Sequence, residues 1–150
     1  MDREIAKFRD DLFWELGRIV AALDGLRDDE LRWTPDADDA NSLGSIATHA
    51  IAAAERHIVG LLLQEREVDA PFEAASGTEI QRRLAETEAR IAEAFERIDA
   101  GELLRERPTA VGISTGRECL LWAVEHAAEH VGAAELTRGL VLRRRDPPTG

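Results

Sequence analysis

Three of the four histidines in this sequence are spaced as the ligands of one metal ion would be. His126 and His130 are four residues apart, so on a helix their side chains lie about 40° apart around the axis and about 6 Å apart along it. His49 lies on the apolar side of another predicted helix, where an unpaired imidazole is costly to bury. The spacing favours a three-histidine site for one divalent metal ion. The alternative is three unrelated histidines, each with one nitrogen against a carbonyl group.

Three further residues near these histidines are candidates for chemistry. Glu129 lies inside the histidine pair and is the candidate catalytic base, with an ordinary surface glutamate as the alternative. His57 follows His49 by eight residues, which on an α-helix is about 80° around and about 12 Å along, so we expect it at the surface or a helix end. Cys119, the only cysteine, precedes the histidine pair by about two turns, and we expect a buried structural thiol.

These side chains must be positioned by helices, because hydrophobic residues recur at three- and four-residue steps in four segments. Two capping boxes, Ser76 with Glu79 and Thr115 with Glu118, mark the starts of the third and fourth segments. No segment alternates with period two, so no sheet is expected. The predicted fold is all-α, an antiparallel four-helix bundle that forms a single domain over residues 1–150. The predicted helices cover residues 5–26, 42–66, 77–98 and 116–142.

Composition limits the partners of the protein. The formal net charge of -11 argues against binding to nucleic acid or to an anionic membrane, since both require a basic surface. There is no apolar run of about 20 residues and no signal peptide at the start, so a cytoplasmic location is expected. Phe13 and Trp14 lie beside the main apolar stripe of the first helix. This aromatic pair predicts a homodimer contact, and the alternatives are that it lines a pocket or forms part of a broad core-facing surface.

Several short motifs follow one another along the chain. Those in the first half are Leu23–Leu26, Leu31–Trp33, Asn41–Ile46, His49 and Glu55. Those in the last helix are Leu121–His126, His130, Gly132 and Arg138. The order and spacing of these motifs resemble the DinB-like (YfiT-like) superfamily of metal-dependent enzymes over nearly the whole chain. The sequence departs from the family at Val131–Ala133, where some relatives carry a polar pocket residue after the second histidine.

This resemblance implies a four-helix bundle, frequently a homodimer, in which His49, His126 and His130 bind zinc, nickel or a similar divalent ion. Members of the family include S-transferases that use the low-molecular-weight thiols bacillithiol or mycothiol. The arginine-rich composition of the chain favours mycothiol of the two. Many other members have no known reaction, so the resemblance alone does not identify the substrate.

Three functions are consistent with these residues. A three-histidine site leaves one coordination position open, which is typical of catalytic metal sites. With no internal nucleophile evident, the first hypothesis is a metal-dependent enzyme that transfers a thiol to an electrophile in a pocket beside Trp122, or that hydrolyses its substrate. The second is a non-catalytic stress-response protein that binds a metal or a small molecule. The third is a metal-free dimer in which the histidines only pack.

Overall fold

The structure is a computed structural model that describes residues 2–65, 76–110 and 112–145. Most of these residues are helical, as the hydrophobic periodicity predicts. None of the helices in the described ranges has a stretch long and apolar enough to cross a bilayer. The elements in chain order are α1 (Arg3–Ala21), α2 (Asp28–Leu31), α3 (Leu43–Glu55), the π-helical segment η1 (Arg56–Leu62), α4 (Gly77–Glu96), α5 (Ala100–Leu104), β1 (Glu106–Thr109), β2 (Gly112–Thr115) and α6 (Gly116–Arg145).

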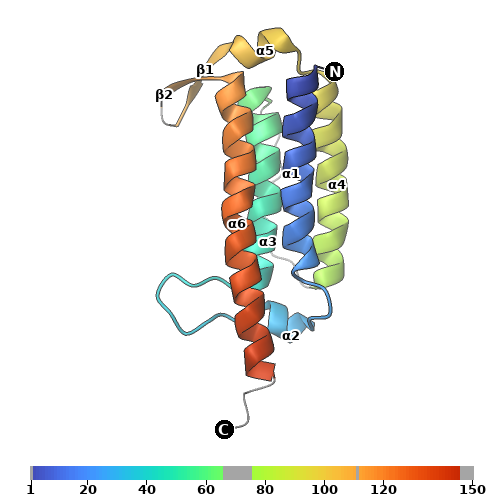
Figure 1. The fold of residues 1–150 in the computed structure, drawn as a ribbon, viewed down its shortest axis with the longest axis vertical. Coiled ribbons are helices and arrows are strands. Elements are labelled where there is room, and N and C mark those ends of the chain that lie inside the picture. The colour runs from blue at the N-terminus through green and yellow to red at the C-terminus, as the bar shows by residue number, and fades with distance from the viewer. Residues whose placement is uncertain (1, 66–75, 111, 146–150) are drawn as a thin grey trace.

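Four long helical segments lie side by side: α1, α3 with η1, α4 and α6 (Figure 1). Helix α1 contacts α6, α4 and α3, and α3 also contacts α4 and α6. Two ion pairs join α1 to α6, Glu4 with Arg117 at 2.6 Å and Arg18 with Glu135 at 2.7 Å. Because the residue numbers increase together in these pairs, α1 and α6 run parallel to each other.

Helix α4 likewise runs parallel to α3 and η1, since Glu55 pairs with Arg90 and Glu65 pairs with Arg97. The expectation of antiparallel neighbours is therefore wrong within these two pairs of helices, although the pairs themselves run in opposite directions (Figure 1). The physical reason is the length of the connection between η1 and α4. At about 3.3 Å per extended residue it can return to the end of the molecule where α3 begins.

The hydrophobic core follows the predicted stripes closely. Every apolar residue predicted on one face of the third helix is buried in α4 or just after it, including Ile91 and Phe95. The facing surfaces of α3 and α6 consist largely of alanine, which lets the two helices approach closely. The buried alanines on these helices are Ala47, Ala50, Ala52, Ala53, Ala54, Ala123, Ala127 and Ala134. This close approach places the histidines of α3 and α6 opposite each other.

A β-hairpin before α6 was not expected. Strands β1 and β2 pair antiparallel with Arg107 opposite Ser114, and both of these polar residues are buried. Arg107 donates to the carboxylate of Glu102 at 2.9 Å. Strands of four residues that bury polar side chains have no period-two hydrophobic pattern, so the sequence gives no signal for them. The capping box that follows is confirmed, because Glu118 accepts from the backbone N–H of Thr115 at 2.6 Å.

The C-terminal half of α6 is tied to the segment between α1 and α3. Arg145 forms an ion pair with the buried carboxylate of Glu30 in α2. Arg138 donates to the backbone oxygens of Ala22 and Asp24 at 2.6 and 2.7 Å, which satisfies carbonyl groups at the end of α1. These contacts hold α6 in register with the elements that surround the histidines.

Candidate metal centre

Three histidines from two helices converge at the middle of the α3–α6 interface. The Nε2 atom of His126 lies 3.2 Å from Nε2 of His49 and 3.1 Å from Nε2 of His130. One nitrogen from each ring lies within 4.8 Å of the other two. His126 and His130 are brought together by one turn of α6, as predicted, whereas His49 reaches them only because α3 packs against that turn. The structure thus places all three predicted ligands in one cluster.

The spacing of these nitrogens fits a divalent ion. Two imidazole nitrogens bound to one tetrahedral zinc ion at about 2.0–2.1 Å are separated by about 3.3 Å. The two shortest Nε2 separations in the cluster, 3.1 and 3.2 Å, are close to this value. Without an ion, Nε2 of His126 is either a donor or an acceptor and not both, so its one proton or one lone pair would be shared between two neighbours. An ion lets all three nitrogens use their lone pairs.

The surroundings of His126 and His130 favour neutral imidazoles, which is the form that binds metal. Burial is the main cause that lowers the pKa of His126, and the neighbouring His49 lowers it further. The pKa of His130 is lowered in the same way, first by burial and then by His126 and His49. The carboxylate of Glu129 partly opposes both shifts. At neutral pH these two nitrogens are therefore available as ligands.

His57 lies much nearer to the cluster than the sequence predicts. Its ring centroid is 5.5 Å from that of His126, and the two ring planes make an angle of 82°. His57 lies just past the end of α3, one of the two positions expected for it, but its Nδ1 atom is buried and has no hydrogen-bond partner among the described residues. Burial is the main cause that lowers the pKa of His57 to about 4, and the charges of His126, Arg56 and His49 add to it.

The cause of this difference is the π-helical segment η1. The chain leaves the α-helix after Glu55, and Leu63 donates to the carbonyl of Ile58, five residues earlier, at 3.2 Å. A π-helix turns through a smaller angle per residue than an α-helix, so the α-helical estimate of the direction of His57 does not apply. π-Helical segments are rare and are found frequently at functional sites. No residue type in η1 marks it in the sequence.

The other candidate residues are placed as follows. Glu129 is exposed on α6, between His126 and His130 in sequence. Cys119 is fully buried, as predicted, and burial is the main cause that raises the pKa of its thiol. Trp122 is half-buried one turn before His126. Cys119 and Trp122 are not among the residues that come together with the three histidines.

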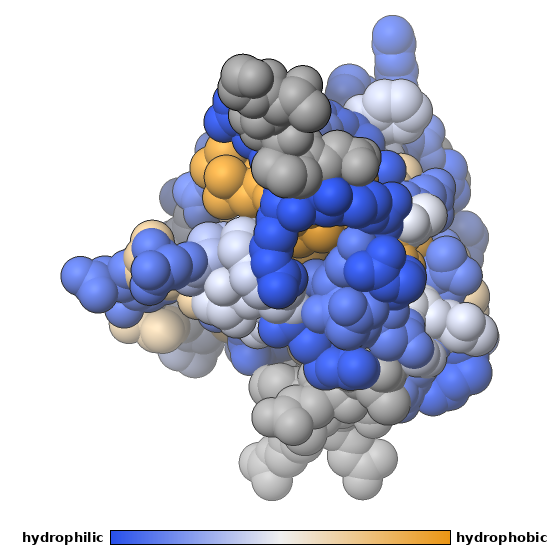
Figure 2. Space-filling view, turned by 90° about the horizontal axis from the view of Figure 1, so that it is seen from below, coloured by the Kyte–Doolittle hydropathy of each residue, from blue (hydrophilic) through white to orange (hydrophobic). Residues whose placement is uncertain are grey.

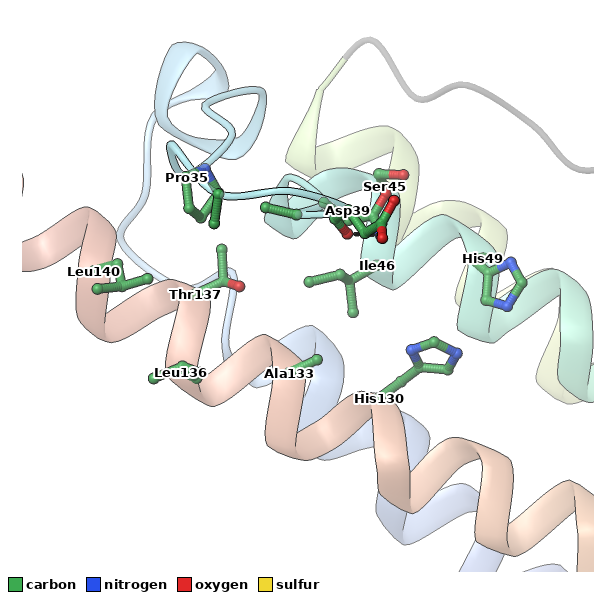
Figure 3. A pocket seen from close by; sticks show the side chains of 13 residues that line it. Pro35, Asp39, Ser45, Ile46, His49, His130, Ala133, Leu136, Thr137 and Leu140 are labelled. Carbon is green, nitrogen blue, oxygen red and sulfur yellow. Dashed lines mark hydrogen bonds between the residues drawn. The ribbon is translucent and has the colours of Figure 1, made fainter.

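A pocket of about 480 Å³ opens beside the cluster. Figure 3 shows His49 and His130 at one end of this pocket and Pro35 and Leu140 at the other. The sequence led us to expect a pocket beside Trp122, but Trp122 does not line this one, which extends from His130 toward the C-terminal end of α6. The loop of residues 35–41, which the sequence showed only as a polar connection, forms its outer wall.

Comparison with known proteins identifies the family. The family model of the DinB superfamily matches residues 14–134, a range that contains all three clustered histidines. The chain belongs to the DinB superfamily. This confirms the resemblance found in the sequence, and the DinB family assignment agrees with a mostly helical protein. No curated protein matches the chain.

Two solved structures match this chain at low sequence identity. A conserved protein from Enterococcus faecalis is 19% identical, with a TM-score of 0.73 over 95% of this chain and 99% of that one. A DinB family member from Shewanella denitrificans is 18% identical, with a TM-score of 0.48 over 97% of this chain and 85% of the other. The first of these supports the arrangement of helices described above.

Proposed function

We propose that this DinB superfamily protein is a metal-dependent enzyme in which His49, His126 and His130 hold one divalent ion, zinc or nickel. The convergence of three Nε2 atoms, two pairs of them 3.1 and 3.2 Å apart, carries the proposal. The packing of α1, α3, α4 and α6 supports a four-helix bundle as the scaffold of this centre. A cytoplasmic location and a homodimeric state stay predictions from the sequence.

We infer further that the enzyme transfers a low-molecular-weight thiol to an electrophile. When bound, a divalent ion lowers the pKa of a thiol or water molecule that coordinates it. The chain itself supplies no accessible thiol, since its only cysteine, Cys119, is buried, so the thiol has to be a cosubstrate. Its proton passes to a base, for which Glu129 is the candidate, and its sulfur forms a bond to the electrophilic carbon. The leaving group departs with the electrons of the bond that breaks.

Elemental analysis of protein purified without a polyhistidine tag tests the metal centre. We expect about one divalent ion per chain in the wild type and a loss of most of it in His126→Ala, with helical circular dichroism retained. A matched control is His57→Phe, which changes a neighbouring ring outside the three proposed ligands. If wild-type protein contains no metal after purification and after addition of zinc or nickel, the metal centre is rejected and the histidines only pack against one another.

The reaction is tested with a panel of thiols, including mycothiol and bacillithiol, and the electrophile monochlorobimane, from which chloride departs. We expect conjugation by the metal-loaded wild type to exceed that by His130→Ala and by Glu129→Gln. Equal rates for wild type and His130→Ala with every thiol would reject the transferase. The metal-dependent hydrolase or the non-catalytic stress-response protein would then be the better interpretation of the same centre.

A further inference from the structure

The pocket beside the three histidines has an apolar wall. Its wall on α6 is formed by Ala133, Leu136 and Leu140, and Ile46 of α3 faces them (Figure 3). Leu136 on this wall is a large hydrophobic residue that is exposed, so an apolar stem bound there would cover it. A volume of about 480 Å³ is sufficient for a small organic molecule. The pocket therefore fits a ligand with an apolar stem.

The described lining of this pocket contains no lysine or arginine. Asp39 is the only acidic residue in this described lining, and the same loop carries Asp36 and Asp38, all three exposed. Two arginines on the adjoining part of α6 have other partners: Arg138 donates to backbone carbonyls, and Arg145 pairs with Glu30. Viewed from below, this end of the molecule is mostly hydrophilic (Figure 2).

An anionic ligand is disfavoured in such a pocket for two reasons. It loses hydration without gaining a cationic partner from the lining, and a buried or half-buried charge without a partner is costly. It is also repelled by Asp39 and by the formal net charge of -11. An uncharged ligand avoids both penalties, and a cationic group near Asp39 gains attraction.

We propose that this pocket selects uncharged or cationic organic ligands and rejects anionic ones, with Asp39 as the residue that sets the preference. Together with the proposed function, on which this part rests, the substrate class is an uncharged or cationic thiol whose apolar stem lies along Ala133 and Leu136. The sulfur would approach the histidines while the polar end of the ligand meets the loop of residues 35–41.

The test uses three thiols with the same six-carbon stem that end in an alcohol, an amine or a carboxylate: mercaptohexanol, aminohexanethiol and mercaptohexanoate. Each is titrated into cobalt-substituted protein, and the sulfur-to-cobalt absorption band reports the affinity. We expect the carboxylate to bind about 3- to 10-fold more weakly than the alcohol, because Asp39 is exposed and its field is partly screened. Asp39→Asn should reduce this difference.

Asp39→Asn is a conservative change, since the backbone of Asp39 has a φ of 59° and asparagine adopts this left-handed conformation as readily as aspartate. Asp10→Asn on the exposed side of α1 is the matched control and should leave the preference unchanged. Equal affinities of the three thiols for the wild type, or the same preference in wild type and Asp39→Asn, would overturn the inference.

A second titration separates the pocket from the metal chemistry. Metal-free protein is titrated with hexanol, hexylammonium and hexanoate, and the amide signals of Ala133 and Thr137 are followed by nuclear magnetic resonance. Weaker binding of hexanoate here, with no cobalt–sulfur band for any thiol, would support the charge selection and reject the thiol in the proposed function. Equal binding of all three compounds would reject the charge selection, whatever the metal does.

Discussion

At the scale of single residues, the geometry of the centre depends on how the ring of His126 is held. His126 is the only one of the three rings whose Nε2 atom contacts both of the others, and the ring of His57 packs against it nearly at a right angle. Residues that orient metal ligands without touching the ion typically change metal affinity by 10- to 100-fold when they are removed. His57 is in a position to orient His126 in this way.

We therefore predict that His57→Ala raises the dissociation constant for zinc about 10-fold, because the ring of His126 loses its neighbour. His57→Phe should stay close to the wild-type value, since phenylalanine retains the edge-to-face contact. Competition with a chromophoric chelator measures both constants. An unchanged zinc affinity in His57→Ala, in a protein with native circular dichroism, would show that His57 does not orient the centre.

The same residues show how far the sequence could predict the site. His126 and His130 were predictable because four residues bring two side chains together on any α-helix. The sequence could suggest His49 as a third ligand, but it could not give its distance from His126 and His130, because that distance depends on the packing of α3 against α6. The nearness of His57 to His126 was not predicted, because the direction of His57 depends on a π-helical segment, which has no sequence signal. The pocket beside His49 and His130 was not predicted, because its wall is an irregular loop without periodicity.

At the scale of elements, the contact between α2 and the end of α6 depends on one carboxylate. Glu30 is buried, and hydrogen bonds from Arg145 are the main cause that lowers its pKa to about 2. A carboxyl group whose pKa is lower in the folded state stabilises the fold fully above its unfolded pKa, which for Glu30 is 4.5. This stabilisation is lost as the pH falls from 4.5 toward 2.

We predict that the wild type loses more unfolding free energy than Glu30→Gln when the pH falls from about 5 to about 2. Urea unfolding followed by circular dichroism at a series of pH values measures this difference. Glu96→Gln, on the exposed end of α4, is the control and should keep the pH dependence of the wild type. Parallel pH profiles for wild type and Glu30→Gln would mean that the pair with Arg145 contributes nothing at this interface.

Element boundaries were predictable wherever a side chain fixes them. Ser76 accepts from the backbone N–H of Glu79 at 3.2 Å, and Ser42 caps α3 by accepting from Ser45 at the same distance. The β-hairpin was not predictable, because Arg107 is buried there by its ion pair with Glu102 and not by hydrophobicity. The direction of α4 could not be predicted from the sequence either, since it depends on which end of the molecule α4 starts from.

At the scale of the whole molecule, the largest side chain on the surface remains without an intramolecular role. Trp14 is 68% exposed on α1, whereas its neighbour Phe13 packs against the core. We predict a homodimer in which Trp14 is buried between two copies, because large aromatic residues contribute strongly to protein interfaces. Light scattering should report twice the chain mass of 16.6 kDa for the wild type and a larger monomer fraction for Trp14→Glu.

The control for the dimer is Leu104→Glu, a change of similar character at an exposed position of the short helix α5. This variant should retain the mass of the wild type. A wild-type protein that is monomeric at tens of micromolar concentration would contradict the dimer. The metal centre would be unaffected by that result, since all of its residues come from one chain.

The burial of Cys119 has a practical consequence for every experiment with thiols and electrophiles. The chain carries one sulfhydryl group, it is fully buried, and burial raises its pKa, so the folded protein should neither form mixed disulfides nor be alkylated by the reagents in the assay. We predict no reaction with Ellman's reagent until denaturant is added, followed by release of one equivalent of chromophore. Fast labelling of the native protein would show that α6 opens locally. The reaction of Cys119 with a thiol reagent therefore reports unfolding, because the folded protein should not react with the thiols and electrophiles of the assay.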